Sequence, residues 1–189
     1  MSLQTGYGIQ DFYKTATSRG IARDNLFRIK SIGDVFDSNS DDLLIYAKTG
    51  TVPSRNINTA KVNFKSFEYV VPMGAFYPEN TNWPITFLCD SKYVLRDVLE
   101  TWSRSTFDEH NQLNVKNLVN IDAVLLNNSF TDITNNSRMK EVRSYKFIGC
   151  FPTNVGAMSY NTESTGAFVT CSVNIAFQYY ITDNNPING

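Results

Sequence analysis

Three observations predict a mainly β (α+β) protein with one substantial helix. Charged residues make up only 19% of the 189 residues, and thirteen Phe and ten Tyr dominate the aromatic side chains. This composition favours sheets and turns over helix bundles. Apolar and polar residues alternate in several segments, whereas a helical apolar stripe is clear in one segment.

The chain is expected to form a single domain over residues 1–189, long enough to bury a core. The prediction divides it into an N-terminal arm (1–20), a β-rich core (21–181) and a C-terminal tail (182–189). The sequence shows no repeat, low-complexity tract or Pro-, Gly- or Ser-rich linker that would split this domain.

Two segments have helical character. Residues 8–19 could form a short helix that Gly20 would end. The stronger helix covers about 91–103, with Asp90 or Ser91 as its cap. Its apolar stripe consists of Val94, Leu95, Val98, Leu99 and Trp102, and its other face carries Lys92, Arg96, Asp97 and Glu100. This pattern predicts an amphipathic helix laid on a sheet.

Strands are predicted at residues 25–32, 83–89 and 121–126, and again from Tyr145. The segment DLLIYA, which begins at Asp42, is expected to lead into a further strand, the second along the chain. Residues 48–58, 72–82 and 104–120 are expected to be loops or irregular, and 130–143 an exposed connection or hairpin tip. In residues 60–71 the alternation changes phase at Lys65-Ser66. The strand therefore either turns back as a hairpin or bulges there.

The end of the chain carries the strongest strand signal. Every odd position from Ala167 to Tyr180 is apolar, and four even positions, Thr170, Ser172, Asn174 and Gln178, are polar and uncharged. At about 3.3 Å per residue, one strand of this length would span roughly 46 Å, far beyond an ordinary strand. The preceding stretch, FIGCFPTNVGAMSYN (147–161), is interpreted as a strand running into a turn that contains Pro152, Asn154 and Gly156.

Such a long strand suggests deliberate assembly, because an isolated monomer would leave long strand edges unpaired. The net charge of −1 opposes sequence-independent gripping of nucleic acid. Lys61, Phe64, Lys65, Phe67 and Tyr69 could form a platform for single-stranded nucleic acid. The favoured interpretation of these residues is a β-hairpin with one apolar and one charged face.

The sequence offers no set of catalytic residues, so we expect no enzyme, no cofactor and no metal. The single histidine, His110, lies in a polar loop, and the adjacent Asp108 and Glu109 are interpreted as solvated charge. The segment Asp37–Asp42 resembles the start of a calcium loop but lacks the required Gly and Glu. Cys89, Cys150 and Cys171 are expected to be buried or half-buried thiols.

No run of about 18 apolar residues and no signal-peptide pattern occurs. The protein is therefore expected to be made and kept in a cytoplasm, or built into something assembled there, without binding a membrane.

Several segments in a characteristic order resemble the tail tube proteins of T-even-like contractile-tailed phages. The most specific is FPTNVG (151–156), supported by ARDNLF (22–27). The extended segment TVPSRNINTAKVNF (51–64), the strand WPITFLC before the helix, and the final alternating segment follow the same order. The resemblance covers roughly residues 12–181. Residues 105–119 and the terminal ITDNNPING look longer than this family needs.

The resemblance implies a β-sandwich or barrel-like core with a flanking helix and extended hairpins. It implies a structural virion protein of the phage tail, assembled in the host cytoplasm. Six copies would form a ring, and identical rings would stack into a hollow tube. The tail sheath, baseplate and tail-terminator proteins would be partners, and viral DNA would pass through the lumen without sequence-specific binding.

Two sets of residues are predicted to serve this function. Assembly contacts are expected at Asn56, Lys61, Phe64, Phe67, Tyr69 and Met73 in the hairpin, and at Phe151, Pro152, Asn154 and Gly156. Candidates for the lumen face are Thr170, Ser172, Asn174 and Gln178, unless that face meets solvent outside.

Two alternatives of the same class are a baseplate tube-initiator protein and the inner tube of a related contractile injection system. An alternative of a different class is a monomeric β-sandwich ligand-binding module.

Overall fold

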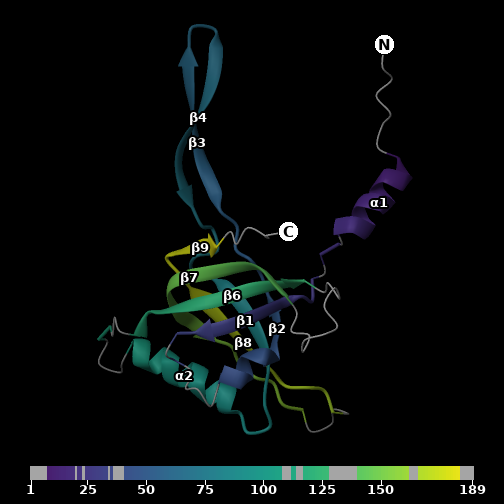
Figure 1. Ribbon diagram of the computed structural model, residues 1–189. Coiled ribbons are helices and arrows are strands. Elements are labelled where there is room, and N and C mark those ends of the chain that lie inside the picture. Colours follow the sequence, from purple (N-terminus) through teal and green to yellow (C-terminus); the bar gives the residue numbers. More distant parts are fainter. Residues whose placement is uncertain are drawn as a thin grey trace.

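The computed structural model describes residues 8–19, 21–22, 24–33, 35, 41–107, 112–113, 117–127, 140–161 and 166–183. Figure 1 shows a β-rich body from which a long hairpin and the first helix project. The helices and strands are α1 (Ile9–Arg19), β1 (Phe27–Ile32), the 3-10 helix η1 (Asp41–Tyr46), β2 (Ala47–Gly50), β3 (Asn56–Phe64), β4 (Phe67–Phe76), β5 (Trp83–Leu88), α2 (Val94–Thr106), β6 (Val119–Asn127), β7 (Lys140–Val155), β8 (Thr170–Ala176) and β9 (Tyr179–Asp183).

The body is built on one antiparallel sheet in the order β1-β6-β7-β8-β5-β2, with β9 also paired to β7. Strands β3 and β4 form a separate two-stranded sheet. The mainly β prediction with one flanking helix is confirmed. The hairpin alternative at Lys65-Ser66 is also confirmed, because Phe64 pairs directly with Phe67 across that turn.

The longest strand is β7, which runs for 16 residues and serves two parts of the sheet. Its first half pairs with β6 on one side and with β9 on the other, and its second half pairs with β8. Gly149 lies between the halves at φ 66°. A Cβ there would lie 2.9 Å from Cγ of Gln178, so this position suits glycine in both conformation and space.

The predicted unbroken strand from Ala167 to Tyr180 is wrong, because β8 ends at Ala176 and β9 begins only at Tyr179. Phe177 leaves the ladder: its N–H donates to the carbonyl of Asn80 at 2.8 Å, and its side chain is buried. The Gln178 N–H donates to the carbonyl of Ile148 at 2.9 Å, after which β9 resumes pairing with β7. The alternation therefore continues in the sequence while the backbone breaks beside Gly149.

The predicted turn at Pro152, Asn154 and Gly156 is also wrong, because β7 continues to Val155. Pairing with β6 ends at Cys150, so Pro152 lies where one edge of β7 has no partner strand among the described residues. A proline without an N–H is tolerated at such an edge. The predicted loop at 72–82 is wrong in part, because β4 continues to Phe76. A register shift beside Pro72 accommodates this proline within the strand.

The core lies where the two halves of the sheet and α2 pack together. Trp83 of β5 stacks on Phe147 of β7 with ring centroids 4.0 Å apart, and Phe177 packs edge-on to both rings. The other fully buried large side chains include Ile29, Ile32, Phe87, Leu95, Leu99, Ile121 and Ile175. Apolar residues of alternating strands thus face inward, as the sequence pattern indicates.

Helix α2 covers Val94–Thr106, about three residues later than predicted, and buries Leu95, Leu99 and Trp102. The carboxylate of Asp90 accepts backbone N–H groups of Lys92, Val94 and Leu95 at 3.1–3.2 Å. Asp90 therefore satisfies donors that the first turn of the helix leaves unpaired. The predicted stripe is confirmed except at its start, where Val94 is exposed.

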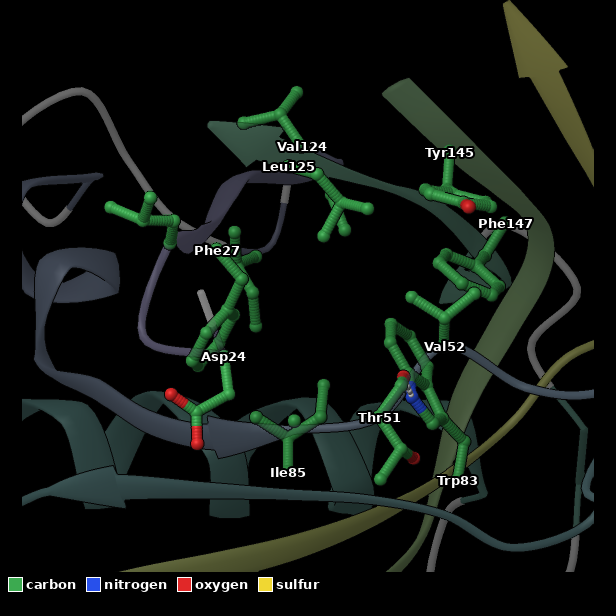
Figure 2. A pocket seen from close by; sticks show the side chains of 14 residues that line it. Asp24, Phe27, Thr51, Val52, Trp83, Ile85, Val124, Leu125, Tyr145 and Phe147 are labelled. Atoms are coloured by element: carbon green, nitrogen blue, oxygen red, sulfur yellow. Dashed lines mark hydrogen bonds between the residues drawn. The ribbon is translucent and has the colours of Figure 1, made fainter. Parts of the chain in front are cut away.

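A cavity of about 140 Å³ lies where the two ends of the sheet, β1 and β2, come close together. Figure 2 shows Phe27, Trp83 and Phe147 among the side chains around it, with Asp24 on the opposite side from Tyr145. Apart from Asp24 and Thr51 the lining is almost entirely apolar. The indole Nε1 of Trp83 donates to the carbonyl of Thr51 at 2.6 Å, which ties β5 to the chain after β2.

Candidate assembly surface

The hairpin of β3 and β4 has two chemically different faces. Residues directly opposite each other in an antiparallel pair project from the same side. The pairs Ala60–Val71, Val62–Tyr69 and Phe64–Phe67 therefore form one face, which we call the apolar hairpin face. The pairs Thr59–Pro72, Lys61–Val70 and Asn63–Glu68 form the other face.

The apolar hairpin face is not covered by the rest of the chain that the structure describes. Phe64 and Phe67 are 61% and 68% exposed, and Val62, Tyr69 and Val71 are exposed as well. Figure 1 shows the hairpin extending away from the body as a free ribbon. A large contiguous exposed apolar surface of this kind marks an interaction site. A two-stranded hairpin alone in water is also only marginally stable.

The predicted hairpin residues do not all lie on one surface. Phe64, Phe67 and Tyr69 share the apolar hairpin face, whereas Lys61 lies on the other face and forms an ion pair with Glu68 at 2.8 Å. Met73 is exposed at the register shift in β4, and Asn56 pairs with Phe76 at the base of the hairpin.

The second predicted set lies in the body, away from the hairpin (Figure 1). Phe151 is half-buried, Pro152 is buried and Asn154 is exposed, all within β7. The Gly156 N–H donates to the Ser172 carbonyl at 2.7 Å, and a Cβ on Gly156 would lie 2.2 Å from Ser172 Oγ. Gly156 is therefore needed for the close approach to β8. Within one copy of the chain, the two predicted sets of assembly residues lie on separate parts of the molecule.

The polar positions of the final segment contribute to the outer surface of the sheet. Ser172 and Asn174 lie on the face of β8 opposite the buried Cys171 and Val173. Paired positions extend this face with uncharged polar side chains at Thr49, Thr86 and Asn154. Thr170 is half-buried at the start of β8, and Gln178 lies beyond its end, in the break before β9.

Arg96 is a structural residue that the sequence analysis placed on the polar side of its helix. Its side chain is only 16% exposed and pairs with Glu100 at 2.5 Å. The guanidinium also donates to the Gly156 carbonyl and lies 3.6 Å from the Cys171 sulfur. Arg96 thus fixes α2 to the segment after β7. Helical periodicity could not reveal this contact, because the partner is 60 residues away.

The three cysteines are free thiols, with Cys150 and Cys171 buried and Cys89 half-buried, as expected. Burial raises the pKa of Cys150 to about 12, so this thiol is protonated at neutral pH. His110, Asp108, Glu109 and the side chains of Asp37–Asp42 lie outside the part of the chain for which side chains are described. None of the described helices is long and apolar enough to cross a membrane.

Solved structures with the same fold come from contractile injection systems. A tube-terminating cap chain of the anti-feeding prophage matches with a TM-score of 0.59 and 12% identity, over 86% of this chain and 90% of that chain. A chain of the PVC sheath–tube complex in the extended state matches with a TM-score of 0.56 and 14% identity, over 89% of this chain and 95% of that chain. A chain of the PVC sheath/tube terminator in the extended state matches with a TM-score of 0.55 and 15% identity, over 86% of this chain and 96% of that chain.

This chain therefore shares its fold with chains of a tube-terminating cap, a sheath–tube complex and a sheath/tube terminator of contractile injection systems. No curated protein matches it by sequence. A family model described as phage tail tube protein matches residues 20–183, so the chain belongs to the phage tail tube protein family. It is a structural component of a phage tail.

Proposed function

We propose that the chain is a tail tube subunit that self-assembles into stacked hexameric rings, and that DNA passes through the resulting hollow tube during ejection. The observation that carries this proposal is the exposed apolar hairpin face, on a chain that belongs to the tail tube family. Neighbouring copies bury this face and thereby stabilise the hairpin. The number of six copies per ring rests on the resemblance to T-even-like tube proteins.

The proposed lumen wall is the outer face of β8 and its neighbours. Ser172 and Asn174 with Thr49, Thr86 and Asn154 present uncharged polar groups there. DNA binds proteins mainly through cationic contacts to its phosphates, so a wall without such contacts lets it slide. Thr170 lies at the margin of this wall, and Gln178 lies outside the regular strand.

The proposed partners are identical rings along the tube and, around and at its ends, sheath, baseplate and terminator proteins. Structures with the same fold come from a sheath–tube complex, a sheath/tube terminator and a baseplate. The role is structural rather than catalytic in this proposal.

A second candidate is a protein that starts or ends a tube, in a phage or in a related injection system. The matches to a tube-terminating cap and to a baseplate chain favour it. Copy number separates the two roles, because a tube needs many rings and an initiator or cap needs one or two. Quantitative mass spectrometry of purified virions, calibrated against the portal and sheath, measures this number.

The direct test is negative-stain electron microscopy of the purified protein at high concentration, with sedimentation velocity on the same samples. Sixfold rings or tubes are the expected result. A monodisperse monomer under all salt and pH conditions, together with its absence from virions, would overturn the proposal. A ligand-dependent rise in melting temperature of such a monomer would instead identify a binding module.

A further inference from the structure

Helix α1 carries an apolar stripe that no other part of the described chain covers. Ile9, Phe12, Tyr13 and Ala16 follow the i, i+3, i+4, i+7 spacing of one helix face, while Asp11, Lys14 and Ser18 lie on the opposite face. Ile9, Phe12 and Tyr13 are 84%, 67% and 72% exposed. An isolated helix of 11 residues is marginal in water, so α1 needs a partner for this stripe.

The α1 stripe and the apolar hairpin face are thus both exposed apolar surfaces among the residues that the structure describes. Figure 1 shows both projecting from the body and well apart, the hairpin at the top of the view and α1 at the upper right. A surface on one side that fits a different surface on the other side makes a head-to-tail contact between copies. Such contacts close into rings when the rotation between copies is right.

The two surfaces also match in size and chemistry. At about 1.5 Å per residue, the 11 residues of α1 are about 16 Å long. The five β3 residues that span the apolar hairpin face, Ala60–Phe64, cover about 17 Å at about 3.4 Å per residue. Both surfaces consist mainly of aromatic and aliphatic side chains. The ammonium of Lys65 lies 5.6 Å from the centroid of the Phe64 ring, at the turn that ends the hairpin. At that position it can stay in water at the edge of the contact.

We infer that α1 of one copy packs on the apolar hairpin face of the laterally neighbouring copy, and that this contact sets the head-to-tail order within a ring. The inference rests on the proposed function, because it requires copies side by side in a ring. It identifies α1 as the segment that covers Phe64, Phe67 and Tyr69. Two α1 residues, Phe12 and Tyr13, are the anchors of the contact.

Cross-linking tests the contact directly. The double variant Tyr13→Cys with Tyr69→Cys, oxidised after assembly, should give a ladder of covalent oligomers, because each copy is linked to two neighbours. A control moves the thiol to the polar side of α1, as Lys14→Cys with Tyr69→Cys. The single variants measure any background from Cys89. A cross-link confined within one chain would overturn the inference, because α1 would then cover its own hairpin.

Substitution tests its energetic importance. Phe12→Ser with Tyr13→Ser should raise the protein concentration needed for half-maximal ring formation at least about tenfold, the size expected from interface anchors. Lys14→Ser with Ser18→Ala, on the polar side, should leave it nearly unchanged. The inference fails and the proposed function stands if the parent forms rings, the Phe12→Ser/Tyr13→Ser variant assembles at the parent's concentration, and the Tyr13→Cys/Tyr69→Cys variant gives no ladder. If the parent forms no rings at all, the proposed function itself fails.

Discussion

The paired strands β5 and β8 and the paired strands β3 and β4 each place apolar residues at alternate positions, but their surroundings are very different. In the first pair, Trp83, Ile85 and Val173 occupy alternate positions of their strands and are at most 2% exposed. In the second, Phe64 and Phe67 alternate with polar residues in the same way and are more than half exposed. Alternation therefore identifies a two-faced strand, but the covering layer is supplied by the same chain in one case only.

The largest effect is expected from removing a core aromatic ring. Trp83→Ala should lower the free energy of unfolding by about 3–5 kcal/mol, because it removes the stack on Phe147 and leaves a void. Urea unfolding followed by circular dichroism measures the change. Phe168→Ala is the matched control: this ring is 87% exposed, so its loss should change stability by no more than about 0.5 kcal/mol. Equal losses in the two variants would contradict the assigned core.

The next effect concerns assembly alone. Phe67→Asp, or Phe64→Asp, should abolish ring formation because it places a charge in the proposed contact. The monomer should change in stability by only about 0.5 kcal/mol, since both rings are exposed in it. Sedimentation velocity and thermal melting separate the two quantities.

Asn63→Asp introduces the same charge on the other face of the hairpin and is the control. Assembly of Phe67→Asp at the parent's concentration would show that the apolar hairpin face is not an interface.

A smaller effect should come from the cap of α2. Partial burial alone would raise the pKa of Asp90, but its backbone N–H donors from Leu95, Val94 and Lys92 outweigh this and hold the pKa below the usual 3.8. Its stabilisation is therefore fully present above the unfolded value and is lost as pH falls through the lower folded value. Asp90→Ala should cost about 0.5–2 kcal/mol at pH 7.

Urea unfolding at pH 7 and near pH 2.5 measures this dependence on pH. The difference in the free energy of unfolding between the parent and Asp90→Ala should be smaller at the lower pH. Asp90→Asn keeps an accepting oxygen and should fall between them at pH 7. A difference in unfolding free energy that grows in acid would contradict the assigned lowering of the Asp90 pKa.

The smallest effect is expected at the C-terminal end. Removing residues 184–189 leaves Asp183, whose backbone pairs with Ser144 as the last residue of β9. Both stability and ring formation should stay close to those of the full chain. Loss of assembly in the truncated chain, measured by electron microscopy, would place a contact in residues 184–189.

The sequence allowed the hairpin and α2 to be predicted because their signals are local. The phase change at Lys65-Ser66 shows the turn, and the apolar stripe shows the helix. The carboxylate of Asp90 accepts first-turn N–H groups, although the residue at the N-cap position is Tyr93. The break at Phe177 could not be seen, because apolar residues keep alternating through it. The break depends on residues that are distant in the sequence: on Gly149 with its positive φ, and on the hydrogen bond from the Phe177 N–H to the Asn80 carbonyl.

The candidate site was predictable in part for the same reason. The shared side of Phe64, Phe67 and Tyr69 follows from period-2 alternation around a known turn. The place of Pro152 does not, because proline and glycine in sequence indicate a turn as readily as a free strand edge or a close strand approach. The contact from Arg96 to Gly156 depends on tertiary packing and has no local pattern.

The long strand β7 has a consequence for how the subunit responds to load. It pairs with β6, β8 and β9, and it packs against α2. Because one strand belongs to both halves of the body, we expect the two halves to unfold together in one cooperative transition. A subunit with this property would yield at a single threshold of force rather than soften gradually, which is a useful trait in a structural component of a phage tail.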